Sequence, residues 1–140
     1  LGVQKFITIL AERTIVREIN TERIKKIIVE SSEQSNRISV PDISKPISLK
    51  NFLYTFPKNG CVVFCDINSN QNSLKNILTK SIDGPICILI GPEGDFSEDE
   101  RKMIIDLNQT HSISLAKNIL KAETAAISAI TIVNYCLNLS

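Results

Sequence analysis

The sequence predicts an α/β domain in which a parallel sheet is flanked by helices. Two runs of five apolar residues, 61–65 and 86–90, are typical of strands that are covered on both faces. Segments with helical features lie between and around these strands, and such alternation favours parallel pairing because parallel strands need crossover connections. A chain of 140 residues suits one domain, so we expect residues 1–140 to form one unit.

The first part of the chain is expected to hold one strand and two helices. Residues 6–10 have the composition of a short strand. Asn20 or Thr21 can cap a helix that ends near Gln34, because isoleucines recur there at helical spacing. Two prolines mark the loop that follows, and Ser48 then begins a second, short helix.

The second part of the chain is expected to continue the alternation of helices and strands. Ser97 and Glu100 form a capping-box pattern, which predicts a helix that runs from there to about Leu107. The other expected elements are a helix at 74–80, a strand at 113–115 and a terminal helix at 122–139.

Composition limits the classes of function. The net charge of +1 argues against a polycation that wraps nucleic acid by charge alone, and no apolar run is long enough to cross a bilayer, so we expect no membrane partner. Four cysteines without a signal peptide suggest a reduced, cytoplasmic protein in which they act as small buried hydrophobes. Together with a single histidine, His111, they give no convincing ligand set, and we expect no metal.

Ligands of open parallel sheets bind beyond the carboxyl ends of the strands. Three loops leave those ends in the predicted order of elements, at 66–70, 91–95 and 116–120. The functional site is therefore expected among these loops.

The loop Gly91-Pro92-Glu93-Gly94 is the strongest local signal. Its glycines permit positive φ and close approach of the backbone, so that a flat ring could lie against main-chain polar groups. The alternative is a strand-to-helix turn that needs glycine for geometry only. Neither the three-glycine dinucleotide fingerprint nor a phosphate loop is present.

The segment from Leu115 to Ala125 is the second signal. Ile119 and Leu120 are apolar residues in a loop, where they either wall a pocket or plug the core. Lys121 reads most simply as a solvated charge, and Glu123 and Thr124 as residues of a first helical turn.

Taken together, these motifs resemble one family. They are Gly-Pro-Glu-Gly followed by Phe-Ser-x-x-Glu at 91–100 and Leu-x-x-x-Ile-Leu-x-x-Glu-Thr-Ala at 115–125. Glu-Gln-Ser-x-Arg at 33–37 with Val-Pro at 40–41, Leu-Gly-Val at 1–3 and Glu-Arg-Thr at 12–14 also match. This order of motifs resembles the RsmE-type 16S ribosomal RNA (uracil-N3)-methyltransferases of the SPOUT class.

The resemblance implies transfer of a methyl group from S-adenosylmethionine to N3 of a uridine in small-subunit ribosomal RNA. It also implies a homodimer and a deep trefoil knot in the C-terminal part of the domain, an exception to unknotted connectivity. The apolar face of the last helix favours the dimer as well. Carried onto this chain, the cofactor-binding residues are Gly91, Pro92, Glu93, Gly94, Leu115, Ile119 and Leu120, with Gly91, Leu115 and Leu120 expected to contact adenine and ribose through their backbone.

The same resemblance assigns the catalytic roles to Lys121, Glu123 and Thr124. Lys121 stands where the family usually has arginine and would favour negative charge developing on the uracil oxygens. Glu123 and Thr124 would orient Lys121 or the base. The general base stays open between solvent and Glu123.

Four positions depart from the family pattern, which favours glycine at Asp95 and Ala116 and arginine at Asn118 and Lys121. These departures suggest an alternative, a catalytically degraded, dimerising relic of such a domain without turnover. The family's N-terminal PUA-like barrel and the opening strand and helix have no counterpart in these residues, so we expect an N-terminally truncated SPOUT domain that binds ribosomal RNA weakly.

Overall fold

A computed structural model describes residues 1–15, 18–70, 78 and 82–138. Its main sheet has three parallel strands in the order β6-β5-β7, which are Ile86–Ile90, Cys61–Cys65 and Thr110–Ile113. The central residue Val63 is paired with Ile88 on one side and with His111 on the other. The predicted parallel α/β architecture is confirmed by this sheet.

The two edge strands of this sheet differ in how well they were predicted. β7 starts at Thr110, three residues earlier than the strand predicted at 113–115. The reason is that the polar residues Thr110, His111 and Ser112 also pair with β5. An edge strand tolerates such residues, which are only half-buried. β6 is the other edge of the described sheet and is mostly half-buried, whereas β5 is buried over its first four residues. The residues of β6 nevertheless pack on both faces, Cys87 and Leu89 with one cluster and Ile86 and Ile88 with the other.

Near the N-terminus, two small parallel ladders replace the single strand predicted at 6–10. They pair β1 (Lys5–Phe6) with β3 (Asp42–Ile43) and β2 (Ile9–Leu10) with β4 (Ile47–Ser48). The partners β3 and β4 lie in the segment predicted to be a loop. Main-chain hydrogen bonds across about 38 residues stabilise them, including one of 2.9 Å from the Ser44 N–H to the Phe6 carbonyl.

The helices largely follow their predicted caps. α1 (Thr21–Gln34) begins after Asn20, α2 (Leu49–Thr55) after Ser48, and α4 (Glu98–Ile105) after the complete capping box of Ser97 and Glu100. α4 ends two residues earlier than predicted, and α5 covers Ala122–Asn138. The helix predicted at 74–80 lies, apart from residue 78, outside the described residues.

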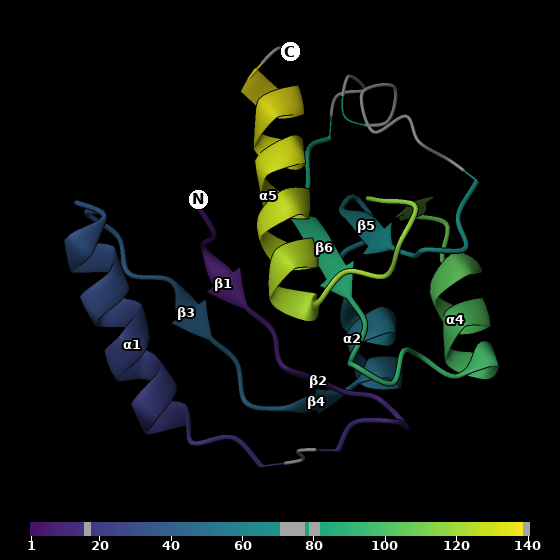
Figure 1. Ribbon diagram of the computed structural model, residues 1–140, viewed down its shortest axis with the longest axis horizontal. Coiled ribbons are helices and arrows are strands. Elements are labelled where there is room, and N and C mark those ends of the chain that lie inside the picture. Colours follow the sequence, from purple (N-terminus) through teal and green to yellow (C-terminus); the bar gives the residue numbers. More distant parts are fainter. Residues whose placement is uncertain (16–17, 71–77, 79–81, 139–140) are drawn as a thin grey trace.

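Helices cover the sheet on both faces. Phe52 of α2 and Ile104 of α4 pack with Phe64 in one buried cluster, whereas Val133 of α5 packs with Val63 and Ile113 in another. Figure 1 shows α5 running beside β6, with α2 and α4 on the other side of the sheet and α1 set apart beyond β1 and β3. Among the described helices, none is long and apolar enough to cross a membrane.

Candidate functional site

A cavity of about 390 Å³ lies at the carboxyl ends of β5 and β6, beside the start of α5. Three segments from distant parts of the sequence contribute to its walls, as predicted for loops at this edge of a parallel sheet. The lining residues are Cys65, Asp66, Ile67, Ile90, Gly91, Pro92, Glu93, Asp95, Leu115, Ala116, Asn118, Ile119, Leu120, Lys121, Ala122 and Ala125.

The structure brings most of the predicted site residues together at this cavity. Of the predicted cofactor residues, Gly94 is absent from the lining described here, and the other six belong to it. Lys121 lines the cavity and is exposed to solvent. Glu123 and Thr124 are exposed in the first turn of α5 and do not belong to the described lining.

The turn at 91–95 is built differently from the prediction. Among the described residues, neither Gly91 nor Gly94 has a positive φ; Asp95 has one, of 59°. The Asp95 N–H donates to the Pro92 carbonyl at 2.9 Å, and the Asp95 carboxylate accepts the Phe96 N–H at 2.8 Å. This local hydrogen bond offsets part of the cost of the left-handed conformation for a residue with a Cβ.

Gly91 lies close to the two residues that end the loop. A Cβ added there would lie 3.1 Å from Oδ1 of Asp95 and 3.5 Å from the Phe96 ring. Phe96 is buried and makes an edge contact with Phe64 at 5.8 Å between ring centroids, so that it has little room to move. The loop therefore keeps a bare stretch of backbone at the cavity wall.

Gly94 is held from outside the cavity by the turn at residues 11–14. The Arg13 Nη1 group donates to the Gly94 carbonyl at 3.0 Å, and a Cβ on Gly94 would lie 3.3 Å from that of Arg13. Beside this contact, the buried carboxylate of Glu100 accepts the Glu12 N–H at 2.9 Å and the Ser97 N–H at 3.1 Å. We call the hydrogen bonds from Glu12 to Glu100, from Ser97 to Glu100 and from Arg13 to Gly94 together the 12–100 brace.

An ion pair supports the wall formed by the loop after β5. Arg101 donates to Oδ2 of Asp66 through Nη2 at 2.7 Å and Nε at 3.1 Å, and the Asp66 side chain is only 3% exposed. These hydrogen bonds are the main cause of the raised pKa of Arg101. Sequence reasoning assigned no role to Asp66, although an acid directly after a buried strand signals the need for a partner.

The thiol at the cavity wall is protonated. Burial raises the pKa of Cys65 to about 12 and, with a smaller contribution from Cys61, that of Cys87 to about 11. Because the thiolate is the reactive form, Cys65 is poorly suited to nucleophilic chemistry. Within the described ranges, no group of three or more histidine, cysteine or acidic side chains is arranged to hold a metal ion.

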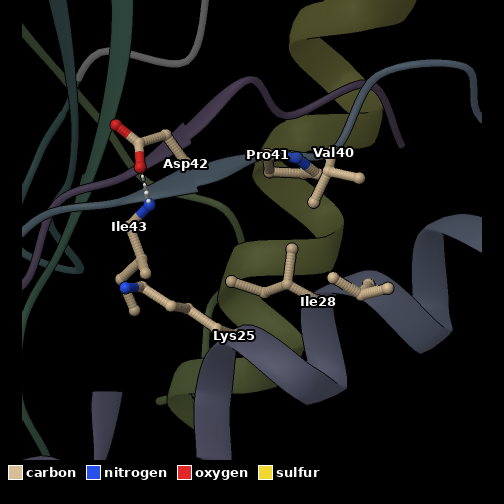
Figure 2. Close-up of a pocket in the computed structure, with 7 residues that line it drawn as sticks. Lys25, Ile28, Val40, Pro41, Asp42 and Ile43 are labelled. Carbon is tan, nitrogen blue, oxygen red and sulfur yellow. Dashed lines mark hydrogen bonds between the residues drawn. The ribbon is translucent and has the colours of Figure 1, made fainter. Parts of the chain in front are cut away.

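A second cavity, of about 320 Å³, lies between α1 and the segment 40–43 (Figure 2). Ile28 faces Val40 and Pro41 across it, and the one carboxylate in its lining, that of Asp42, accepts the Ile43 N–H at 2.9 Å. This cavity offers few polar groups to orient a ligand, so the cavity at the strand ends is the better candidate site.

The fold and the first cavity define an α/β domain with a cavity of small-molecule size at the ends of its strands. Residues 1–134 match the family model described as an RNA methyltransferase domain. The chain therefore belongs to this family of RNA methyltransferase domains.

Curated relatives with the name ribosomal RNA small subunit methyltransferase E agree with this assignment. The protein of Rickettsia conorii is 37% identical over 131 residues, which are 93% of this chain and 53% of the relative. The protein of Mesomycoplasma hyopneumoniae is 36% identical over 116 residues, which are 81% of this chain and 48% of the relative. The chain thus spans about half the length of these relatives.

Solved structures of similar proteins agree with the α/β fold, a parallel sheet flanked by helices. The Neisseria gonorrhoeae ribosomal RNA small subunit methyltransferase E, solved bound to S-adenosyl methionine, has a TM-score of 0.81 and 29% identity, covering 91% of this chain and 52% of its own. A probable rRNA-methyltransferase from Porphyromonas gingivalis also has a TM-score of 0.81, with 25% identity, and covers 94% of this chain and 55% of its own.

Proposed function

We propose that this chain is the S-adenosylmethionine-dependent catalytic domain of a ribosomal RNA methyltransferase that modifies N3 of a uridine in 16S ribosomal RNA. The observation that carries the proposal is the single cavity that joins the segments 91–95 and 115–121. These are the two segments whose motifs resemble the family, and relatives that match over most of this chain are named as small-subunit ribosomal RNA methyltransferases.

The residues of the cavity fit a nucleoside-like cofactor. Its volume lies in the usual range of about 300–1,000 Å³ for small-molecule sites, and aliphatic walls such as Ile90, Leu115 and Leu120 suit an adenine ring. The backbone at Gly91 offers polar groups without a covering side chain. We assign the cofactor contacts to Gly91, Leu115 and Leu120 through main-chain atoms, with the side chains of Pro92, Glu93 and Ile119 around them, and give Gly94 the role of anchoring the loop to Arg13.

The bound cofactor would supply a methyl group already activated on a sulfonium. The protein then has to align donor and acceptor and to exclude water. Lys121, exposed where it lines the cavity, is placed to stabilise negative charge on uracil oxygens as N3 loses its proton. Glu123 and Thr124 lie in the first turn of α5, from which we propose that they orient Lys121 or the uracil.

Cofactor binding tests the first half of the proposal. Ile119 and Ile15 form a matched pair, because they are 85% and 87% exposed and only Ile119 lines the cavity. In titration calorimetry, Ile119→Ala should weaken S-adenosylmethionine binding about three- to tenfold through lost apolar contact, whereas Ile15→Ala should leave it unchanged. No heat at millimolar cofactor with the unmodified chain would refute the proposal.

Turnover tests the second half of the proposal. Expression of this chain in a methylase-null cell should restore N3-methyluridine in the small-subunit RNA. Lys121→Ala should abolish that signal, and Lys117→Ala, in the same exposed loop but outside the described lining, should keep it. Intact cofactor binding without any methylation would instead establish the non-catalytic relic, which the residues Asn118, Lys121 and Asp95 favour.

The remaining features of the family are proposed for this chain as well. We propose that residues 1–140 form one SPOUT domain with a C-terminal trefoil knot, in the cytoplasm with its ribosomal RNA substrate, and that the net charge of +1 makes its own RNA binding weak. A cofactor-bound crystal structure tests the knot: tracing residues 115–138 must show them passing through a loop formed by the preceding chain.

We further propose a homodimer formed through α5. Ile127, Ile132 and Tyr135 on this helix are 58%, 38% and 66% exposed, an unusual amount of apolar surface for one helix of a small monomer. Light scattering at micromolar concentration should give twice the chain mass, and Tyr135→Glu should give the monomer. A monomer without the substitution would refute the dimer.

A further inference from the structure

The Asp95 carboxylate is a fixed charge at the wall of the cavity. Its Oδ1 atom accepts the Phe96 N–H at 2.8 Å and lies over Gly91, 3.1 Å from where a Cβ would stand. The Asp95 backbone is held at a φ of 59° by the turn hydrogen bond to Pro92, and the buried Phe96 anchors the next residue. The carboxylate is therefore positioned before any ligand enters.

The other charged side chains in the described lining of the cavity do not neutralise Asp95. Asp66 also lines the cavity, but Arg101 pairs with it through two hydrogen bonds to Oδ2, and its Oδ1 accepts the Asn68 N–H. Arg101 is within electrostatic reach of Asp95 as well, yet its hydrogen bonds go to Asp66. The remaining charged side chains of the described lining are those of Glu93, Asp95 and Lys121. Two negative charges and one positive charge give a net charge of −1.

That excess matters because the methyl donor and its demethylated product differ in charge. The donor carries a sulfonium that the product lacks as a neutral thioether, while the rest of the two molecules is the same. Both molecules carry the same ammonium and carboxylate of the amino-acid part, so the sulfonium gives the donor one more positive charge than the product. A carboxylate at the wall therefore attracts the donor more strongly.

We propose that Asp95 recognises the positive charge of the methyl donor and makes this site prefer S-adenosylmethionine over S-adenosylhomocysteine. The inference rests on the proposed function and goes beyond it, because it names what sets the selectivity between donor and product. Weaker binding of the product also favours its dissociation after methyl transfer and the binding of a new donor molecule.

The test is the ratio of the two dissociation constants, measured by titration calorimetry with each ligand. Asp95→Asn keeps the acceptor for the Phe96 N–H and removes only the charge. It should weaken donor binding about three- to tenfold, the range for one charge pair in a water-exposed setting, and leave product binding within about twofold. Glu98→Gln, an exposed acid three residues later and outside the described lining, is the matched control and should change neither constant.

A second variant guards against effects on the turn. Asp95→Gly removes the charge and also the strain of the positive φ, so it should fold at least as well and show the same fall in the ratio. Raising the salt concentration should reduce the donor preference of the unmodified chain and not that of the variants.

The outcomes separate the two claims. Equal losses for donor and product, or no change in either, would overturn the role of Asp95 while leaving the proposed function in place. Failure of the unmodified chain to bind either ligand would refute the proposed function, and this inference with it.

Discussion

Replacing Glu100 by alanine should destabilise the domain far more than its place at the start of a helix suggests. Glu100 is 8% exposed, and its side chain accepts hydrogen bonds from two main-chain N–H groups, those of Glu12 at 2.9 Å and Ser97 at 3.1 Å. Glu100→Ala leaves both donors without their acceptor. Each partly buried hydrogen bond to a charged group contributes about 1–2 kcal/mol, so the free energy of unfolding should fall by about 2–4 kcal/mol.

Urea unfolding followed by circular dichroism measures this loss. Glu100→Gln keeps one acceptor oxygen and should lose about half as much. The control is Asp99→Ala, an exposed acid in the same first turn, which should cost only about 0.3–1 kcal/mol from the helix dipole. A loss for Glu100→Ala no greater than that of the control would show that the 12–100 brace does not stabilise the fold.

Three further predictions concern the walls of the cavity. Phe96→Ala should lower the free energy of unfolding by about 3–5 kcal/mol, measured in urea, because it empties a buried ring position against the neighbouring strand. Arg101→Gln should cost about 2–3 kcal/mol in the same assay, and Arg101→Lys less, because Asp66 is left buried without the cation that donates twice to its Oδ2; equal stability of the unmodified chain and both variants would contradict this. Cys65 and Cys87, whose pKa values burial raises to about 12 and about 11, should react with iodoacetamide at pH 8 much more slowly in the folded chain than in urea. These folded-state pKa values lie above that of about 8.5 for an unfolded thiol, so the two thiols should not change the stability below about pH 8.5. The stability should then fall as the pH rises to about 11 for Cys87 and about 12 for Cys65, by up to about 1.4 kcal/mol per pH unit for each thiol; a stability that rises over this range would refute it.

Local patterns predicted most of the elements. The apolar run at 61–65, the serine caps and the capping box of Ser97 with Glu100 each involve neighbours in sequence, and the structure has an element at each. The short ladders near the N-terminus were missed because two-residue strands carry no periodicity of their own. They exist only through pairing with β3 and β4, more than 30 residues away.

The sequence predicted the position of the candidate site but not the interactions that hold its loops in place. The rule that ligands bind at the carboxyl ends of parallel strands located the cavity loops. The positive φ lies at Asp95 rather than at Gly91 or Gly94, and the one sequence signal for it is the glycine that the family pattern favours at position 95. The pairing of Asp66 with Arg101 likewise joins side chains 35 residues apart, and only the folded sheet brings them together.

The 12–100 brace connects the cavity loop to the N-terminal part of the domain. Its contacts join Glu12 to Glu100, 88 residues apart, and Arg13 to the carbonyl of Gly94 in the cavity loop. Coupling free energies are reciprocal. If the docked turn at residues 11–14 orders the cavity loop and so strengthens ligand binding, a bound ligand stabilises the docking of that turn by the same free energy. We therefore expect the amide protons of residues 12–14, which lie outside the described lining, to exchange more slowly when a ligand fills the cavity.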